Sequence, residues 1–306
     1  MSAEVDAGGD EPADEFAWLP EKAAEAGVPA GGLLPVRRTG AGAAHGGLSG
    51  LRWGDGSPEL VLLHGGGQNA HTWDTVLAAL GVPALAVDLP GHGHSDWRED
   101  REYSPRANAA AVSEALAVWG VGGLPVVGMS LGGLTALALA AHSPRLVTSL
   151  VVVDVTPSVL ARVARMTTAQ RGTTALVAGP AVFEDLDSMV AAAAAGAPNR
   201  SPASLRRGVV HNARRLPDGR WAWRYDRQHA SPEAFEELWD DVAALHVPIT
   251  LVRGGESPFV GDEDVAEFRA RHAGLDVQVV PGAGHSVQSD RPVELATILR
   301  EVLARG

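Results

Sequence analysis

The sequence predicts an α/β fold: a mostly parallel sheet with helices on both faces and an inserted helical cap. Three observations support this. Short, almost wholly apolar runs such as 59–63 and 146–153 are typical of strands that are covered on both faces. Helical patterns follow most of these runs after short Gly-rich connections, which indicates βαβ units. A block of about 90 residues, 155–245, then interrupts the alternation with helical patterns and no buried strand run.

Composition narrows the classes of function. The 306 residues carry a net charge of −12, which disfavours nucleic acid or an anionic membrane as a partner. The chain has no cysteine, so disulfides, thiolate catalysis and Cys-ligated metals are excluded. The first residues lack the basic and apolar regions of a signal peptide, and no apolar run reaches the ~18 residues of a membrane span. We therefore expect a cytoplasmic protein that binds neither nucleic acid nor a membrane, and we leave its oligomeric state open.

The first half of the chain contains most of the expected core. Residues 1–16 are rich in Asp, Glu, Gly and Pro, and we expect a disordered acidic tail there. Strands are expected at 33–38, 47–53, 59–63, 84–87, 124–127 and 146–153, and helices at 16–26, 70–80, 105–119 and 131–141. Together these make 17–154 the first part of the core.

The second half contains the cap and completes the sheet. Within 155–245, helices are expected at 157–166, 180–195, 202–212 and 232–244, with a turn and a short strand at 218–225. The sheet pattern resumes in 246–306, with strands at 247–252 and 277–280 and helices at 262–272 and 292–304. We therefore predict that 17–154 and 246–306 form one core, with 155–245 as a helical cap.

The stretch Gly128-Met129-Ser130-Leu131-Gly132 lies between a predicted strand and a predicted helix. Gly-x-Ser-x-Gly at such a junction is the nucleophile elbow pattern. The sharp turn strains the backbone at the serine, and side chains two residues before or after it would collide with the neighbouring strand and helix. The serine hydroxyl would then lie at a helix N-terminus, where free N–H groups favour negative charge.

Residues that can carry chemistry follow several of the predicted strands. His64, Asp88, Ser130 and Asp154 each come at or just after a strand end, so they should gather at one edge of a parallel sheet. A serine hydroxyl needs an adjacent base that an acid orients. His285 follows the last strand in a Gly-rich loop and supplies that base in the order Ser, acid, His.

Four motifs together resemble the α/β-hydrolase superfamily, in its capped branch of esterases, carbon–carbon bond hydrolases and lactonases. They are His64-Gly65, Asp88-Leu89-Pro90-Gly91-His92-Gly93, Gly128-Met129-Ser130-Leu131-Gly132-Gly133 and Gly284-His285. The resemblance implies that Ser130 is the nucleophile and His285 the general base. It also implies an oxyanion hole formed by the backbone N–H groups of Gly66 and Leu131, and it requires no cofactor and no metal. His64 and His92 are expected to hydrogen-bond the backbone.

The catalytic acid departs from the commonest pattern of that family. The family usually has Asp in a Gly-x-x-Asp pattern after the strand that matches 247–252, and this sequence has Ser257 there. A serine cannot balance the charge of an imidazolium. Asp154, at the end of the strand after the nucleophile helix, and Glu256, beside the usual position, are the two alternatives. We favour Asp154 because a carboxylate at a strand end next to the elbow already faces the site.

Several apolar residues are candidates for the substrate pocket: Met129, Trp73, Trp221, Trp223 and Phe259. The predicted activity is hydrolysis of a carboxylic ester or lactone of a small apolar substrate through an acyl-enzyme. Cleavage of a carbon–carbon bond in a diketone is the first alternative. A non-catalytic ligand-binding protein of the same fold is the second, and the serine at position 257 is the reason to consider it.

Overall fold

The protein is described by a computed structural model that covers residues 14–42, 46–197, 200–227 and 233–305. Its centre is an eight-stranded sheet in the order β1-β2-β4-β3-β5-β6-β10-β11. The strands are β1 (Val36–Ala41), β2 (Leu48–Trp53), β3 (Leu60–Leu63), β4 (Ala84–Asp88), β5 (Leu124–Met129), β6 (Val147–Val153), β10 (Ile249–Gly254) and β11 (Leu275–Val280). The strand β2 runs antiparallel to β1 and β4, and every other pair is parallel.

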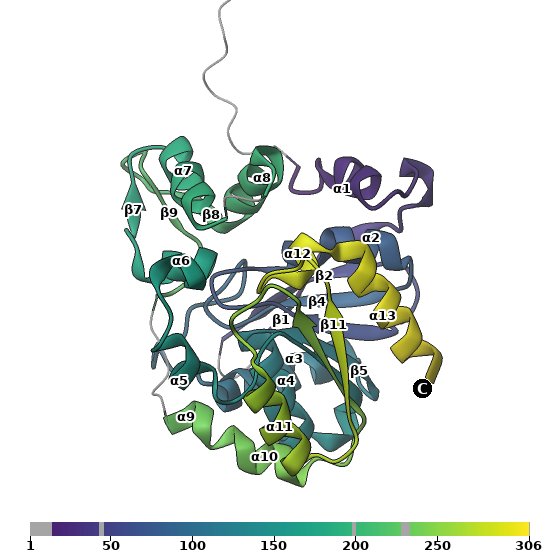
Figure 1. Cartoon of the computed structure of the whole chain (residues 1–306). Helices are drawn as coiled ribbons and strands as arrows, with labels where there is room; N and C mark the ends of the chain where they lie inside the picture. Colours follow the sequence, from purple (N-terminus) through teal and green to yellow (C-terminus); the bar gives the residue numbers. More distant parts are fainter. Residues whose placement is uncertain (1–13, 43–45, 198–199, 228–232, 306) are drawn as a thin grey trace, which may run out of the picture.

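Helices cover both faces of this sheet (Figure 1). One face packs against α3 (Pro105–Trp119), α4 (Leu131–His142), α10 (Leu238–Ala244) and α11 (Asp262–Arg271). The other packs against α1 (Leu19–Glu25), α2 (Asp74–Leu80) and α13 (Pro292–Arg305). Neighbouring residues of a strand alternate between the two clusters: Val126 belongs to the first and Val127 to the second. This explains why the central strands are apolar at nearly every position.

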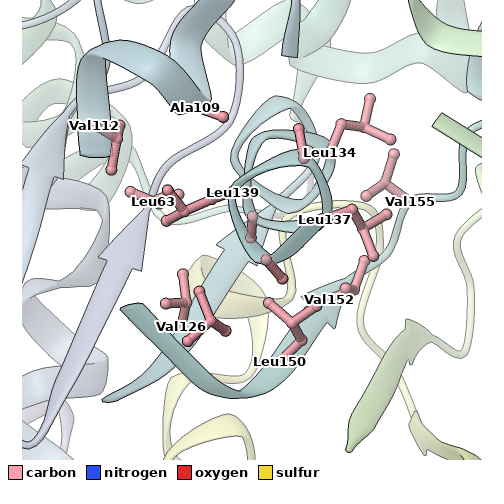
Figure 2. Close-up of a cluster of buried hydrophobic side chains, with 14 of the residues drawn as sticks. Leu63, Ala109, Val112, Val126, Leu134, Leu137, Leu139, Leu150, Val152 and Val155 are labelled. Carbon is pink, nitrogen blue, oxygen red and sulfur yellow. The ribbon is translucent and has the colours of Figure 1, made fainter. Parts of the chain in front are cut away.

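The helix α4 is buried along most of its length between α3 and the central strands (Figure 2). Leu134 and Leu137 from α4 lie among Val126, Leu150 and Val152 from β5 and β6. Each fully buried side chain of this size contributes about 1.5–3 kcal/mol relative to an exposed one. The close packing fixes α4 against β5, and with it the turn between them.

Residues 172–197 and 200–227, which we call the cap unit, form a separate layer over one end of the core (Figure 1). The unit contains α7 (Leu186–Gly196), α8 (Pro202–Asn212) and a three-stranded sheet in the order β7 (Val182–Phe183), β9 (Trp221–Trp223), β8 (Ala213–Arg215). Its apolar side chains form their own cluster, which includes Met189, Val209 and Trp223. The short helices α5 (Val159–Val163) and α6 (Thr168–Arg171) connect it to the core.

The remaining elements are short: η1 (Ala30–Gly32), η2 (Ala70–Trp73), η3 (Pro144–Leu146), η4 (Gly172–Ala178), α9 (Glu233–Glu236) and α12 (Val287–Asp290). In the part of the chain that is described, no helix is both long and apolar enough to cross a membrane.

The α/β fold is confirmed, and three details differ from the sequence prediction. Residues 182–183, expected at the start of a helix, pair as a strand with β9. The helix α10, expected in the cap, packs in the core against α4 through Leu238 and Val242. Residues 1–13 of the expected acidic tail lie outside the described residues, whereas Glu15 forms an ion pair with Arg38 on β1. The division into core and cap otherwise stays a prediction.

Candidate active site

Ser130 sits at the turn between β5 and α4 with φ 51° and ψ −119°, a conformation that non-glycine residues rarely adopt. Its backbone N–H donates to the carbonyl oxygen of Val153 at 3.1 Å, which ties the turn to β6. A Cβ atom on Gly128 would overlap the carbonyl oxygen of Gly132, and one on Gly132 would overlap that of Leu63. The glycines of the motif are therefore needed for the close approach of strand and helix.

Asp154 follows β6 and is fully buried, also with a positive φ of 53°. Its Oδ1 accepts a hydrogen bond from the backbone N–H of Gly254 at 2.9 Å. Its Oδ2 accepts one from the hydroxyl of Ser257 and lies 2.8 Å from Nδ1 of His285. Hydrogen bonds from a backbone amide, a hydroxyl and an imidazole stabilise the charged carboxylate in this buried position.

His285 is held between Asp154 and an aromatic ring. Its imidazole stacks on Phe259, with ring centroids 3.6 Å apart and an angle of 14° between the planes. Its side chain is 9% exposed. Among the described residues, its Nε2 has no hydrogen-bond partner. Because Nδ1 contacts Asp154, Nε2 is the nitrogen that can accept a proton from a group in the cavity. Ser130 and His285 both line this cavity.

The two alternatives for the acid differ in their surroundings. Glu256 is exposed at the cavity, and its backbone N–H donates to the carbonyl oxygen of Ala283 at 2.9 Å. Within the described part of the chain, His285 has its carboxylate contact with Asp154. Ser257, at the position where the family usually has Asp, donates its hydroxyl to that same carboxylate. The serine that replaces the family's usual Asp therefore hydrogen-bonds the carboxylate of Asp154.

Residues 65–68, which we call the oxyanion loop after the role that the sequence predicts for Gly66, follow β3. The Nδ1 of His64 lies 2.8 Å from the carbonyl oxygen of Gly65, and its Nε2 accepts a hydrogen bond from the backbone N–H of Leu89 at 2.9 Å. These partners require a neutral ring with its proton on Nδ1. Burial and the nearby His92 lower the pKa of His64 to about 3, so it stays neutral at physiological pH.

A second histidine contacts the same loop. The Nε2 of His92 accepts a hydrogen bond from the backbone N–H of Gly67 at 3.1 Å, and its Nδ1 lies 3.0 Å from the carbonyl oxygen of Pro90. Burial lowers the pKa of His92 as well. The expectation that His64 and His92 hydrogen-bond the backbone is therefore confirmed. In the part of the chain described, the backbone N–H groups of Gly66 and Leu131 have no hydrogen-bond acceptor.

A cavity of about 1130 Å³ lies between the core and the cap unit, and Ser130, His285 and Gly66 line it. Of the predicted pocket residues, Met129 and Trp223 also line it. Trp73, Trp221 and Phe259 are not among the described lining residues: Trp73 is fully buried in the core, Trp221 packs in the apolar cluster of the cap unit, and Phe259 packs on His285.

The lining of the cavity is more polar than a site for a purely apolar substrate requires. It includes Gln68, Asn69, Thr72, Arg171 and Arg200. The restriction to apolar substrates stays a prediction, and these polar side chains do not require it.

His71, Asp74 and His211 are one group whose potential metal-ligating atoms all lie within 4.8 Å of one another. Two features work against a bound cation. Lys22 Nζ already lies 2.6 Å from Oδ2 of Asp74. The imidazoles of His71 and His211 stack face to face, 3.8 Å apart at 13°, so their lone pairs lie in nearly parallel planes and do not converge. The cluster instead joins α2 to α8 and α1.

The fold and the arrangement around Ser130 define the class of protein. The sequence profile described as "Alpha/beta hydrolase family" matches residues 60–298, so the chain belongs to the α/β hydrolase family.

Two relatives in Mycobacterium tuberculosis are similar over most of the chain. Esterase Rv0045c is 55% identical over 292 residues, which cover 95% of this chain and 96% of the esterase. Lipase LipV is 29% identical over 263 residues, which cover 82% of this chain and 96% of the lipase.

Solved structures give the same assignment. The crystal structure of Esterase Rv0045c aligns with a TM-score of 0.85 at 52% identity and covers 96% of this chain and 99% of its own. The structure of E-2-(acetamidomethylene)succinate hydrolase aligns with a TM-score of 0.73 at 25% identity and covers 87% and 98%.

Proposed function

We propose that the chain hydrolyses a small carboxylic ester or lactone through an acyl-enzyme on Ser130, with His285 as general base and Asp154 as its acid. The contact of 2.8 Å between Asp154 Oδ2 and His285 Nδ1 is the observation on which this assignment rests. The reaction class follows from the family and from the 55% identity to Esterase Rv0045c. The finer assignments rest on the chemistry of the residues at this one edge of the sheet.

The proposed reaction has two stages. His285 Nε2 takes the proton of Ser130 as the hydroxyl oxygen attacks the substrate carbonyl, and then gives that proton to the leaving alcohol. A water molecule next attacks the acyl-enzyme and gives its proton to His285, which returns a proton to Ser130 as the acid leaves. The buried carboxylate of Asp154 keeps the His285 proton on Nδ1 and stabilises the transient imidazolium.

The backbone N–H groups of Gly66 and Leu131 would stabilise the negative charge that develops on the carbonyl oxygen of the substrate. Leu131 is the first residue of α4, where an N–H group has no acceptor within the helix and the helix dipole favours an anion. His64 holds the carbonyl oxygen of Gly65, and in a trans peptide the N–H of the next residue points the opposite way. That next N–H belongs to Gly66, which lines the cavity.

Turnover of a substrate panel tests the proposal. The panel contains p-nitrophenyl acetate, butyrate and octanoate, a δ-lactone and a 1,3-diketone. We expect turnover of esters or the lactone, and a loss in kcat of about 10⁶-fold in Ser130→Ala. Ester turnover within tenfold of wild type in Ser130→Ala would overturn the mechanism. Turnover of the diketone alone would reassign the reaction to carbon–carbon cleavage.

A further inference from the structure

The oxyanion loop is held from the cap unit as well as from the core. Asn212, the last residue of α8, donates its side-chain Nδ2 to the carbonyl oxygen of Gly67 at 2.7 Å. Its Oδ1 accepts a hydrogen bond at 2.8 Å from Nδ2 of Asn69, which follows the loop directly. One amide side chain of the cap unit therefore makes two hydrogen bonds to the segment that contains Gly66.

The direction of these hydrogen bonds is fixed by backbone groups. The carbonyl oxygen of Gly67 can only accept, so Asn212 must present its NH₂ group there and its oxygen to Asn69. Asn69 also donates to the carbonyl oxygen of His211 at 2.9 Å and accepts from the backbone N–H of His71 at 3.0 Å. No member of this network can be flipped without losing hydrogen bonds.

Gly67 is therefore held on both sides. Its N–H donates to His92 of the core and its carbonyl oxygen accepts from Asn212 of the cap unit, so both peptide planes that flank it are fixed. Its φ of 71° lies in the left-handed region, and a Cβ atom there would lie 3.2 Å from Cγ2 of Val177 and 3.5 Å from the ring of Tyr225. Side chains of the cap unit thus pack directly on the loop.

We propose that Asn212 is a positioning residue of the oxyanion hole: it anchors the loop at Gly67, directly after Gly66, so that the N–H of Gly66, whose own peptide plane His64 orients, reaches its place only when the cap unit is seated. This rests on the proposed function, because it needs Gly66 to bind the developing oxyanion. It assigns the cap unit a part in the chemical step in addition to its place as a wall of the cavity.

The expected effect lies in kcat. The carbonyl oxygen gains its full negative charge only in the transition state, so a misplaced N–H group weakens transition-state binding more than substrate binding. Removing one oxyanion donor outright costs about 10²–10³-fold in kcat. A donor that remains present but is less well held should cost less, and we expect a loss of about 10- to 100-fold.

Two variants of Asn212 test the proposal. Asn212→Ala removes both hydrogen bonds. Asn212→Asp keeps the size and the acceptor for Asn69 but, when ionised, faces the carbonyl oxygen of Gly67 with a second acceptor. For p-nitrophenyl butyrate we expect kcat to fall about 10- to 100-fold in both, with KM within threefold of wild type. Phosphonylation by a fluorophosphonate, which places an oxygen in the same hole, should slow by a similar factor.

The pH dependence of Asn212→Asp separates positioning from simple structural damage. A protonated carboxyl group can donate to the carbonyl oxygen of Gly67, so the ratio of variant to wild-type kcat should rise as the pH is lowered. Glu21→Gln is the matched control. It weakens an ion pair of 3.0 Å between α1 and Arg207 on the same helix α8, without contact to the oxyanion loop, and should keep wild-type kcat.

The proposal is wrong if both Asn212 variants keep kcat within twofold of wild type, or if their loss appears in KM alone. A ratio of Asn212→Asp to wild-type kcat that does not change with pH would also count against it. These outcomes are distinct from a failure of the proposed function, in which the wild-type protein itself would not react with the fluorophosphonate.

Discussion

The core and the cap unit are stabilised in different ways. The core has two apolar clusters, one on each face of the sheet, and the strands pass through both. The cap unit has an apolar cluster of its own, and many of its contacts with the core are polar. These include Asn69 with Asn212, Arg200 with Asp290 and Tyr103 with Asp226.

This difference indicates a division of roles. Apolar packing fixes the backbone that carries Ser130, Asp154 and His285 in one arrangement, because a close-packed interior resists small displacements. Polar contacts at the seam are individually worth about 1 kcal/mol and can be exchanged for water, so the cap unit can shift without unfolding the core. The predictions below test this contrast, from the largest expected effect to the smallest.

The largest effect is expected for the acid in the core. Asp154→Asn keeps the shape but removes the charge that balances the imidazolium, and kcat should fall about 10⁴-fold, the loss known for the corresponding change in a serine protease. Glu256→Gln is the matched variant of the exposed carboxylate and should stay within threefold. Steady-state kinetics with p-nitrophenyl butyrate decide between them, and the reverse result would make Glu256 the acid.

Truncation of buried side chains should separate the two regions in stability. Leu137→Ala in α4 removes a fully buried side chain of the core and should lower the free energy of global unfolding by about 2–5 kcal/mol. Met189→Ala removes a fully buried side chain from the apolar cluster of the cap unit. We expect hydrogen exchange to rise within the cap unit alone in Met189→Ala. A uniform rise over the core would mean that the two regions unfold as one.

The stability that Glu15 contributes through its ion pair with Arg38 should fall in acid. Burial opposes the charge of Glu15, but contacts with His71 and Arg38 outweigh it and lower its pKa from 4.5 to about 2. A lowered pKa in the folded state means that the unfolded chain binds the proton more tightly. The stability from Glu15 is therefore complete above about pH 5 and is lost as the pH falls towards 2.

Denaturant unfolding at several pH values measures this contribution. Glu15→Gln should show a shallower loss of stability between about pH 5 and 2 than the wild-type protein. Equal slopes in the two proteins would show that His71 and Arg38 do not hold Glu15 in solution.

The smallest effect is expected at the seam. Arg200 Nε of the cap unit lies 3.0 Å from Oδ1 of Asp290 on α12, and both side chains are about one-fifth exposed. Exposed pairs contribute about 0.2–1 kcal/mol, and this pair is open to solvent in part, so Arg200→Gln should lower the stability by about 1 kcal/mol. Thermal unfolding measures it. A loss of several kcal/mol would mean that this one polar contact contributes as much as a buried apolar side chain, which would contradict the contrast between the two regions.

Elements with strong local signals were predictable from the sequence. The helix expected at 105–119 is observed as Pro105–Trp119, because Ser104 caps its N-terminus and Gly120 ends it in the left-handed conformation. The parallel pairing of the central strands follows from the alternation of strands and helices in the core. The elbow was visible because its glycines are needed for a close approach of backbone to backbone.

Features that depend on distant partners were not predictable. The two-residue strand β7 exists through its pairing with β9, and two residues are too few to show the period of a strand. The periodicity of α10 shows that one of its faces is apolar. It does not show whether that face packs on the core or within the cap, and the structure places it against α4. Asn69 and Asn212 are 143 residues apart, and neither belongs to a motif. For Ser257 a signal existed: its position in the family's acid pattern points to the carboxylate that it contacts.

Covalent labelling tests the central claim most directly. The wild-type protein is incubated with a fluorophosphonate, its intact mass is measured, and the modified peptide is sequenced by mass spectrometry. We predict one adduct per chain, located on Ser130, and none in Ser130→Ala. An unmodified wild-type protein, or an adduct that persists in Ser130→Ala, would contradict the assignment of Ser130 as the nucleophile.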